Sequence, residues 1–284
     1  MFRKMLFCTD LSPASDALIQ CVKELKIIGL EEAILTHVIY VANTPGLEVM
    51  LADEARPILE RQKKILEDQG IRVTVEMPFG LPAHTLDETA EKHDVSAILI
   101  GSHGKGILQT ATLGSVSAKL LHETRRPVLL VRINLLEDGR CEVVCRKMFA
   151  KVLFPTDFSE NAEKALDYLG KIALETQCPI TVTHVISEKD DDPAAAQRRE
   201  EDARHLLEAK KRRLETLGAA EVAIDLVRGK AVEEIIGRTK KGNFSIIVMG
   251  SQGKGFLREV FLGSVANDVA RHAGVPVLFV PAFR

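Results

Sequence analysis

The glycine framework Gly-x2-Gly-x9-Gly-Ser occurs twice in this chain, from Gly101 to Ser115 and from Gly250 to Ser264, 149 residues apart. Ten of the sixteen aligned positions, 101–116 and 250–265, are identical. Each copy follows an apolar run typical of a buried strand and precedes a run typical of a helix. Glycine permits close backbone approach and positive φ, and a helix N-terminus offers unpaired N–H groups with a partial positive charge. The pattern therefore predicts a phosphate site in each half.

The candidate phosphate-binding residues are Gly101, Gly104, Gly114 and Ser115 in the first half and Gly250, Gly253, Gly263 and Ser264 in the second. The alternative is that the glycines only mark turns. Lys105 and Lys254 fit equally as phosphate contacts and as exposed loop lysines. A P-loop is excluded because glycine follows each of these lysines, and Gly-x-Gly-x-x-Gly does not follow the first strand of either half.

Two aspartates, Asp10 and Asp157, come directly after the first predicted strand of each half. If the first and fourth strands are neighbours, each aspartate faces a glycine loop across one crevice. A carboxylate there suits a nucleoside hydroxyl, since its charge repels phosphate. The alternative is that both are ordinary residues near a helix start. His37 and His184 lie in strand-like runs and are interpreted as hydrogen-bonded core histidines.

Matching segments recur along the whole chain, which indicates an internal duplication. Short apolar runs alternate with amphipathic ones, and this predicts an α/β fold of two tandem open, doubly wound domains. Each is expected to hold a five-stranded parallel sheet with helices on both faces. The predicted domains are residues 1–133 and 148–284, joined by a linker at 134–147 with an expected turn at 137–139. Expected helices include 12–28, 48–69, 115–123, 194–217 and 264–272, and one expected strand is 33–40.

The composition limits the function further. A net charge of −2 without a long basic run disfavours nucleic-acid binding. No apolar stretch approaches the ~20 residues that span a bilayer, and the start shows no signal-peptide pattern, so we expect a soluble cytoplasmic protein. The five scattered cysteines form no framework. Cys141 and Cys145 are interpreted as free thiols, with a disulfide or half a metal site as alternatives.

These motifs resemble the universal stress protein family, as a tandem two-domain member of its ATP-binding branch. The resemblance rests on Thr9–Ser12 and Thr156–Ser159, on the His-Val pairs at 37–38 and 184–185, and on both glycine frameworks. It implies an adenine nucleotide alpha hydrolase-like fold that binds ATP or AMP, with Mg²⁺ or Mn²⁺ held through the phosphates. It places Asp10 and Asp157 at the adenosine pocket, the backbone of Val38 and Val185 at adenine, and the glycine motifs with Ser115 and Ser264 at ribose and phosphate. Cys8, where the second half has Pro155, departs from this pattern.

The leading functional hypothesis is an adenine-nucleotide-binding regulator of a stress response. The alternative is a slow ATPase or phosphoryl-transfer enzyme, which needs a metal clamp and a group that positions the attacking oxygen. No catalytic residue is assigned, because Glu259 has Thr110 opposite it. A third reading is a structural module without nucleotide. The apolar strands 128–131 and 277–280 could pair within one chain as a pseudo-dimer, and the resemblance also implies homodimers.

Overall fold

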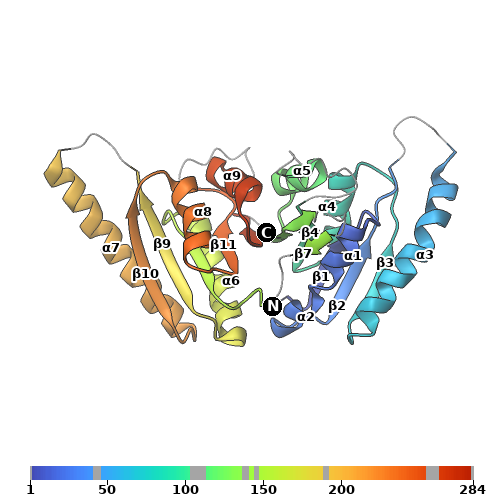
Figure 1. Cartoon of the computed structure of the whole chain (residues 1–284), viewed down its shortest axis with the longest axis horizontal. Coiled ribbons are helices and arrows are strands. Elements are labelled where there is room, and N and C mark those ends of the chain that lie inside the picture. The colour runs from blue at the N-terminus through green and yellow to red at the C-terminus, as the bar shows by residue number, and fades with distance from the viewer. Residues whose placement is uncertain are drawn as a thin grey trace. The chain divides into compact units, whose positions relative to one another are not determined.

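The computed structural model describes residues 2–40, 46–102, 113–135, 141–143, 147–187, 192–253 and 262–282 of the 284. The chain folds as two compact units, Met1–Arg146 (unit 1) and Lys147–Arg284 (unit 2), each built on its own strands (Figure 1). Among the described residues, no helix is long and apolar enough to cross a membrane.

Unit 1 contains a five-stranded sheet in the order β5-β4-β1-β2-β3, with every pair parallel. Its strands are β1 (Lys4–Cys8), β2 (Glu32–Thr36), β3 (Arg72–Glu76), β4 (Ala97–Gly101) and β5 (Val128–Val131). Its helices are α1 (Pro13–Ile19), α2 (Val22–Ile27), α3 (Glu48–Glu67), α4 (Pro82–Lys92) and α5 (Ser115–Glu123). The chain proceeds outward from β1 to β3 and then returns past β1 to β4. Strand order therefore reverses between β1 and β4, where open α/β sheets bind ligands.

Unit 2 repeats this topology in the order β12-β11-β8-β9-β10, again all parallel. Its strands are β8 (Val152–Pro155), β9 (Ile180–Ile186), β10 (Val222–Arg228), β11 (Ile246–Gly250) and β12 (Val277–Val280). Its helices are α6 (Glu160–Thr176), α7 (Pro193–Thr216), α8 (Ala231–Lys241) and α9 (Ser264–His272). The predicted doubly wound α/β class is confirmed.

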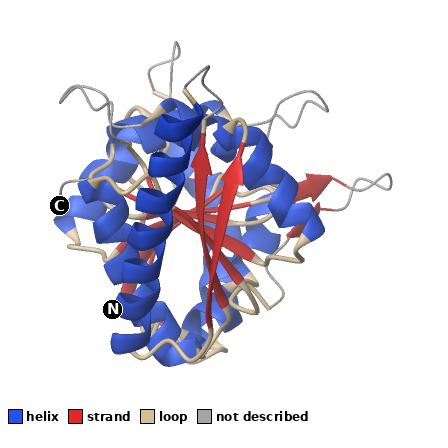
Figure 2. Ribbon diagram, turned by 90° about the vertical axis from the view of Figure 1, so that its left-hand side faces the viewer, coloured by secondary structure: helices blue, strands red, loops and turns tan. Residues whose placement is uncertain are grey.

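Helices flank the strands of each unit, and Figure 2 turns unit 2 toward the viewer. In unit 1, α1 packs against α3, and α4 packs against α5. In unit 2, α7 covers β9 and β10, and α8 packs against α9. Every residue of β4 and β11 is buried, as expected for central parallel strands covered on both faces.

Two predicted elements of unit 1 are wrong in extent. The helix expected over 12–28 is interrupted, because Gln20 and Cys21 bond three residues back and tighten the turn between α1 and α2. The strand expected over 33–40 ends at Thr36, apart from one isolated bridge between Ile39 and Phe79. Pro78, in the segment that follows β3 and runs beside this strand, has no N–H to donate. In unit 2, Val227 replaces it, and β9 continues to Ile186.

The predicted linker region contains a short antiparallel hairpin, β6 (Ile133–Leu135) and β7 (Cys141–Val143). Strand β7 packs on α1. The hairpin begins where the N–H of Ile133 donates to Ser102 Oγ at 3.2 Å, directly after β4. The turn expected at residues 137–139 lies outside the described residues.

Candidate functional site

In unit 2, the carboxyl ends of β8 and β11 open into a cavity of about 430 Å³. This volume lies within the range of about 300–1,000 Å³ that is usual for small-molecule sites. Six predicted site residues of this unit line it: Asp157, Val185, Gly250, Gly253, Gly263 and Ser264. The crevice was predicted on the condition that the first and fourth strands of a unit are neighbours, and β8 does pair with β11.

A tight turn after β8 positions Asp157. The N–H of Phe158 donates to Thr156 Oγ1 at 3.0 Å, and Phe158 adopts a left-handed φ of 61°. The N–H of Ser159 donates to Asp157 Oδ1 at 3.1 Å, and Ser159 Oγ caps helix α6. These bonds fix the carboxylate at the mouth of the strand. Leu11 repeats the left-handed turn in unit 1 with φ 65°.

Gly253 lies directly against this aspartate. A Cβ atom at this position would come within 2.7 Å of Asp157 Oδ2, too close for the carboxylate to keep its place. Glycine permits both close approach and a positive φ, and Gly250, Gly253 and Gly263 do not have a positive φ. Close approach, and not a left-handed backbone, accounts for glycine at position 253.

Helix α9 begins at the same cavity. Its N-cap is Gly263, and no side chain caps its first N–H groups. The N–H of Gly263 itself donates to Ser251 O at 2.7 Å, which holds the end of the loop. Ser264, Val265 and Ala266, the first turn of the helix, line the cavity. Unpaired N–H groups at such a position attract an anion.

Thr183 contributes a polar atom that the sequence analysis did not assign to the site. Its side chain is completely buried and lines the cavity, and Oγ1 has no hydrogen-bond partner among the described residues. Neighbouring His184 is only half-buried, and its Nδ1 bonds the carbonyl of Thr156 at 2.7 Å, so this nitrogen carries the proton. The repeat of Thr-His-Val in both halves was the signal that could have identified Thr183.

Apolar residues complete the cavity, and they were not among the predicted site residues. Ala231 and Ile235 come from the first turns of α8, and Met249 from β11. Their spacing is that of any amphipathic helix or buried strand, so only the packing of α8 over the sheet identifies them.

Unit 1 places its candidate residues at corresponding points of its own sheet. Asp10 follows β1, Val38 follows β2, and Gly101 ends β4. Gly114 is the N-cap of α5, again without a side-chain cap, and Ser115 is the first residue of that helix. Gly104, His103, Lys105 and Thr110 lie outside the described residues, as do Lys254 and Glu259 of unit 2.

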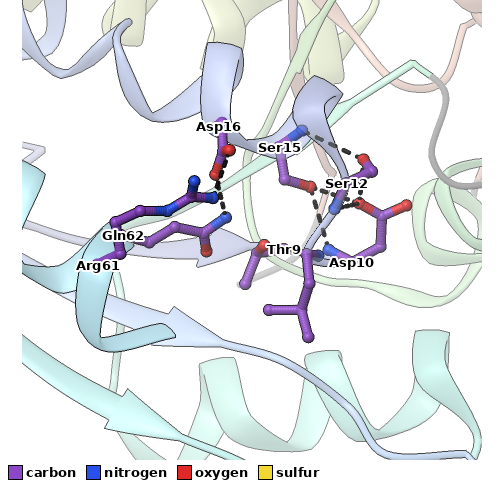
Figure 3. Close-up of polar contacts among 8 residues, drawn as sticks. Thr9, Asp10, Ser12, Ser15, Asp16, Arg61 and Gln62 are labelled. Atoms are coloured by element: carbon purple, nitrogen blue, oxygen red, sulfur yellow. Dashed lines mark hydrogen bonds and ion pairs between the residues drawn. The ribbon is translucent and has the colours of Figure 1, made fainter. Parts of the chain in front are cut away.

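Asp10 is held by two serines at the start of α1 (Figure 3). Its Oδ1 accepts from the N–H of Ser12 at 3.1 Å, from Ser12 Oγ at 2.5 Å and from Ser15 Oγ at 2.6 Å. Ser15 Oγ in turn accepts from the N–H of Asp10 at 3.1 Å. The other carboxyl oxygen points away from both serines. His37 repeats the bond of His184, with Nδ1 at 2.9 Å from the carbonyl of Thr9.

The described cysteines Cys8, Cys21 and Cys178 are buried free thiols. Burial raises the pKa of Cys8 well above its usual range and also raises that of Cys178, so neither thiol is activated. In the described part of the chain, no group of three or more His, Cys, Asp or Glu side chains is arranged to hold a metal ion. The side chains of Cys141 and Cys145 lie outside the described part.

Comparison with known proteins identifies the family. The model of the universal stress protein family matches residues 1–132 and again residues 148–281. The chain belongs to the universal stress protein family. The two matches also confirm the tandem arrangement of two such domains.

Relatives of this family match either one unit or most of the chain. Universal stress protein MJ0577 of Methanocaldococcus jannaschii is 32% identical over 155 residues, which cover 46% of this chain and 96% of that protein. Universal stress protein Rv2005c of Mycobacterium tuberculosis is 27% identical over 239 residues, which cover 80% of this chain and 76% of that protein.

Solved structures agree with this assignment. The chain is similar to the crystal structure of a universal stress protein from Archaeoglobus fulgidus, with a TM-score of 0.77 and 27% identity over 98% of both chains. A putative universal stress protein from Pseudomonas aeruginosa, at 16% identity and a TM-score of 0.64 over 99% of this chain and 94% of that one, shares the fold.

Proposed function

We propose that this universal stress protein binds an adenine nucleotide, ATP or AMP, and acts as a ligand-dependent regulator of a stress response. The observation that carries the proposal is the unit 2 cavity. It joins a carboxylate, an uncapped helix N-terminus and an apolar end in one space. A nucleotide carries the matching groups, namely hydroxyls, phosphates and a base.

The first turn of α9 fits the phosphates. Gly263 places no side chain over the helix start, and the N–H groups of the first turn attract negative charge. No lysine or arginine is among the described residues that line the cavity. Main-chain amides from Ser264 onward would therefore hold the phosphates there, and Mg²⁺ or Mn²⁺ would bind through the phosphates themselves.

Asp157 and the apolar wall fit the nucleoside. A carboxylate accepts hydrogen bonds from the vicinal hydroxyls of ribose and would repel a phosphate in the same place. Val185, Ala231 and Ile235 offer apolar surface for a base. The buried hydroxyl of Thr183 gains a partner when a polar ligand atom reaches it, which removes the cost of leaving it unpaired.

Ligand binding gives such a protein a way to report nucleotide levels. A ligand that binds only the folded form stabilises it by RT ln(1 + [L]/Kd), about 2.7 kcal/mol at a hundredfold excess over Kd. The first test identifies any nucleotide released from the purified, denatured protein by mass spectrometry. The second measures the melting temperature with and without ATP and AMP. We expect an upward shift with at least one of them, and no shift and no released nucleotide would refute the proposal.

The same samples separate binding from turnover. The alternative drawn from the sequence, slow ATP hydrolysis, predicts that labelled ATP is converted to ADP at a rate that depends on Asp157. We expect ATP to remain intact over the time that binding takes to reach equilibrium.

Location and assembly remain predictions. We expect the protein to act in the cytoplasm and to form homodimers. Strands β5 and β12 are outer strands of the sheets of their own units, and such apolar edges are usually covered. A cross-link between cysteines introduced into β5 and β12 would test their pairing within one chain.

A further inference from the structure

We infer that Asn161, which is not among the predicted site residues, positions the phosphate-binding end of the unit 2 cavity and so sets how strongly the site holds a phosphorylated nucleoside. The inference rests on the proposed function. It arises from a buried hydrogen bond that joins the two segments on either side of the cavity, at the carboxyl ends of β8 and β11.

Asn161 is the second residue of α6, and only 5% of it is exposed. Its Nδ2 donates to the carbonyl oxygen of Gln252 at 3.2 Å, although the two residues are 91 positions apart in the chain. A carbonyl accepts hydrogen bonds and cannot donate them, so the nitrogen of the amide must face it. The bond therefore ties the start of α6, close after the turn that holds Asp157, to the segment that follows β11.

Gln252 lies between the two elements that are proposed to hold the ligand. It lines the cavity, and its neighbour Gly253 lies against the carboxylate of Asp157. On the other side, the N–H of Gly263, the N-cap of α9, donates to Ser251 O at 2.7 Å. The segment 251–253 is thus held by α6 from one side and by the start of α9 from the other. Any shift of this segment changes the separation between the carboxylate and the first turn of α9.

Gly250 allows α6 to come this close to the end of β11. A Cβ atom at this position would lie 3.0 Å from both Cγ and Nδ2 of Asn161, and 3.2 Å from its main-chain carbonyl carbon. A larger residue would press the amide away from the carbonyl of Gln252. The first glycine of the framework therefore makes room for Asn161, in addition to any contact with a ligand.

Stability of the fold alone does not account for an amide at this position. Asn161 Oδ1 is buried and has no hydrogen-bond partner among the described residues. A buried oxygen without a partner costs more than one ordinary hydrogen bond returns. In unit 1 the corresponding residue is Ala14, which is buried at the same place in the first turn of α1. A unit of this fold therefore forms without the amide, and this favours a role for Asn161 at the site.

The test compares ATP with adenosine, which has the same base and ribose but no phosphate. The full chain is titrated calorimetrically with ATP, and the affinity for adenosine is measured by its displacement of ATP. Two variants remove the donor: Asn161→Ala shortens the side chain, and Asn161→Leu keeps its branched shape. In both we expect the affinity of unit 2 for ATP to fall about tenfold and that for adenosine to change less than about twofold. Binding in unit 1 is common to all variants, so differences between them report on unit 2.

Ser245→Ala is the matched control. Ser245 Oγ donates to the carbonyl of Lys151 at 2.9 Å and so joins the same two segments just before β11 and β8 begin. This end of the strands is opposite to the cavity. The control removes a comparable hydrogen bond, and we expect both affinities to stay within about twofold of the parent values. Melting temperatures without ligand show whether each variant is folded.

Three results would overturn the inference. They are an unchanged affinity for ATP in both Asn161 variants, equal losses for ATP and adenosine, and a loss in Ser245→Ala as large as that in Asn161→Ala. The last two would mean that the amide supports the unit as a whole and does not position its phosphate-binding end. If the parent protein binds neither ATP nor adenosine, the proposed function itself is refuted.

Discussion

The two units of this protein share a topology and a glycine framework, yet their sites differ in what surrounds the same polar groups. In unit 1, serines hold the carboxylate of Asp10 and the carbonyl of Gly101. In unit 2, alanines stand at both serine positions, and a described cavity opens beside Asp157. Duplication has therefore preserved the frame of the two candidate sites while changing the side chains around it.

The surface formed by the residues that follow β2 and β3 also differs from the corresponding surface of unit 2. Unit 1 exposes three large apolar side chains there, with about half of each accessible. Unit 2 has polar residues at the same positions, and two of them form ion pairs, Arg228 with Glu200 at 2.8 Å and Lys230 with Glu233 at 3.0 Å. The corresponding pairs are Tyr40 and Ser187, Phe79 and Arg228, and Leu81 and Lys230. The two units therefore present different surfaces beside corresponding strands.

The largest predicted effect comes from Gly253→Ala. The added Cβ would lie 2.7 Å from Asp157 Oδ2, so the carboxylate must turn out of its place. Hydrogen bonds to a charged group contribute about 1.5–3 kcal/mol, and we therefore expect nucleotide affinity in unit 2 to fall about 10- to 100-fold. Calorimetric titration with ATP measures this loss.

Gly274→Ala is the matched control. No heavy atom lies within 4 Å of its added Cβ, and its φ is not positive. Both variants should melt close to the parent protein, because neither places a methyl group against rigid backbone. Equal affinity of the two variants for ATP would show that Asp157 does not take part in binding.

A second prediction compares Thr183→Val with Thr36→Val. Removing the unpartnered hydroxyl of Thr183 should stabilise the ligand-free protein by about 1 kcal/mol, because a buried polar group without a partner is lost. Removing the hydroxyl of Thr36 breaks its bond to Ile34 and should destabilise by about 0.5 kcal/mol. Melting curves of the ligand-free protein should show opposite signs.

The same two variants should also differ with ligand present. The shift in melting temperature caused by ATP should shrink more in Thr183→Val than in Thr36→Val, because the hydroxyl of Thr183 lines the cavity without a partner and that of Thr36 already bonds Ile34. Destabilisation by Thr183→Val would mean that water or another group satisfies this hydroxyl, and the contrast between the two threonines would not hold.

The sequence predicted the frame of this protein well. Alternating apolar and amphipathic runs are set by burial on two faces of a sheet, and they predicted the parallel strands and the helices 115–123 and 264–272 with their observed bounds. Errors arose where one residue changed a local pattern. Pro78 lies after β3 and shortens β2 because it cannot donate a hydrogen bond to it. The residues 33–40 carry no sign of this in their own sequence.

The site was only partly predictable, for a related reason. Asp157, Gly253 and Ser264 stood out because their types and spacing repeat. Thr183 and Ile235 reach the cavity through the packing of other elements, and their own neighbours in sequence look like any buried strand or helix. The role of Ser15 also requires the fold, because a serine in a first turn is common whether or not it contacts a carboxylate.

The smallest predicted effect concerns two corresponding carboxylates, Glu76 at the end of β3 and Asp225 within β10. Glu76 Oε1 lies 2.8 Å from Lys92 Nζ and 2.6 Å from His93 Nε2. Burial alone would raise the pKa of Glu76, but hydrogen bonds from Lys92 and His93 outweigh it and lower that pKa below its usual 4.5. Its counterpart in unit 2, Asp225, is bonded at 2.5 Å by Arg238, whose own pKa this bond raises.

The sign of the pH effect follows from the lowered pKa of Glu76. The folded state holds this carboxylate charged more readily than the unfolded state, so its contribution is complete above about pH 4.5 and disappears as pH falls through the folded value. Glu76→Gln should cost about 0.5–1 kcal/mol at pH 7 and make unfolding less sensitive to acid. Urea unfolding from pH 7 to pH 3 measures both effects, with Glu88→Gln on the exposed face of α4 as the control. If Glu76→Gln loses stability in acid as steeply as the parent, the acid sensitivity of unfolding arises from other groups and the role given to Glu76 is wrong.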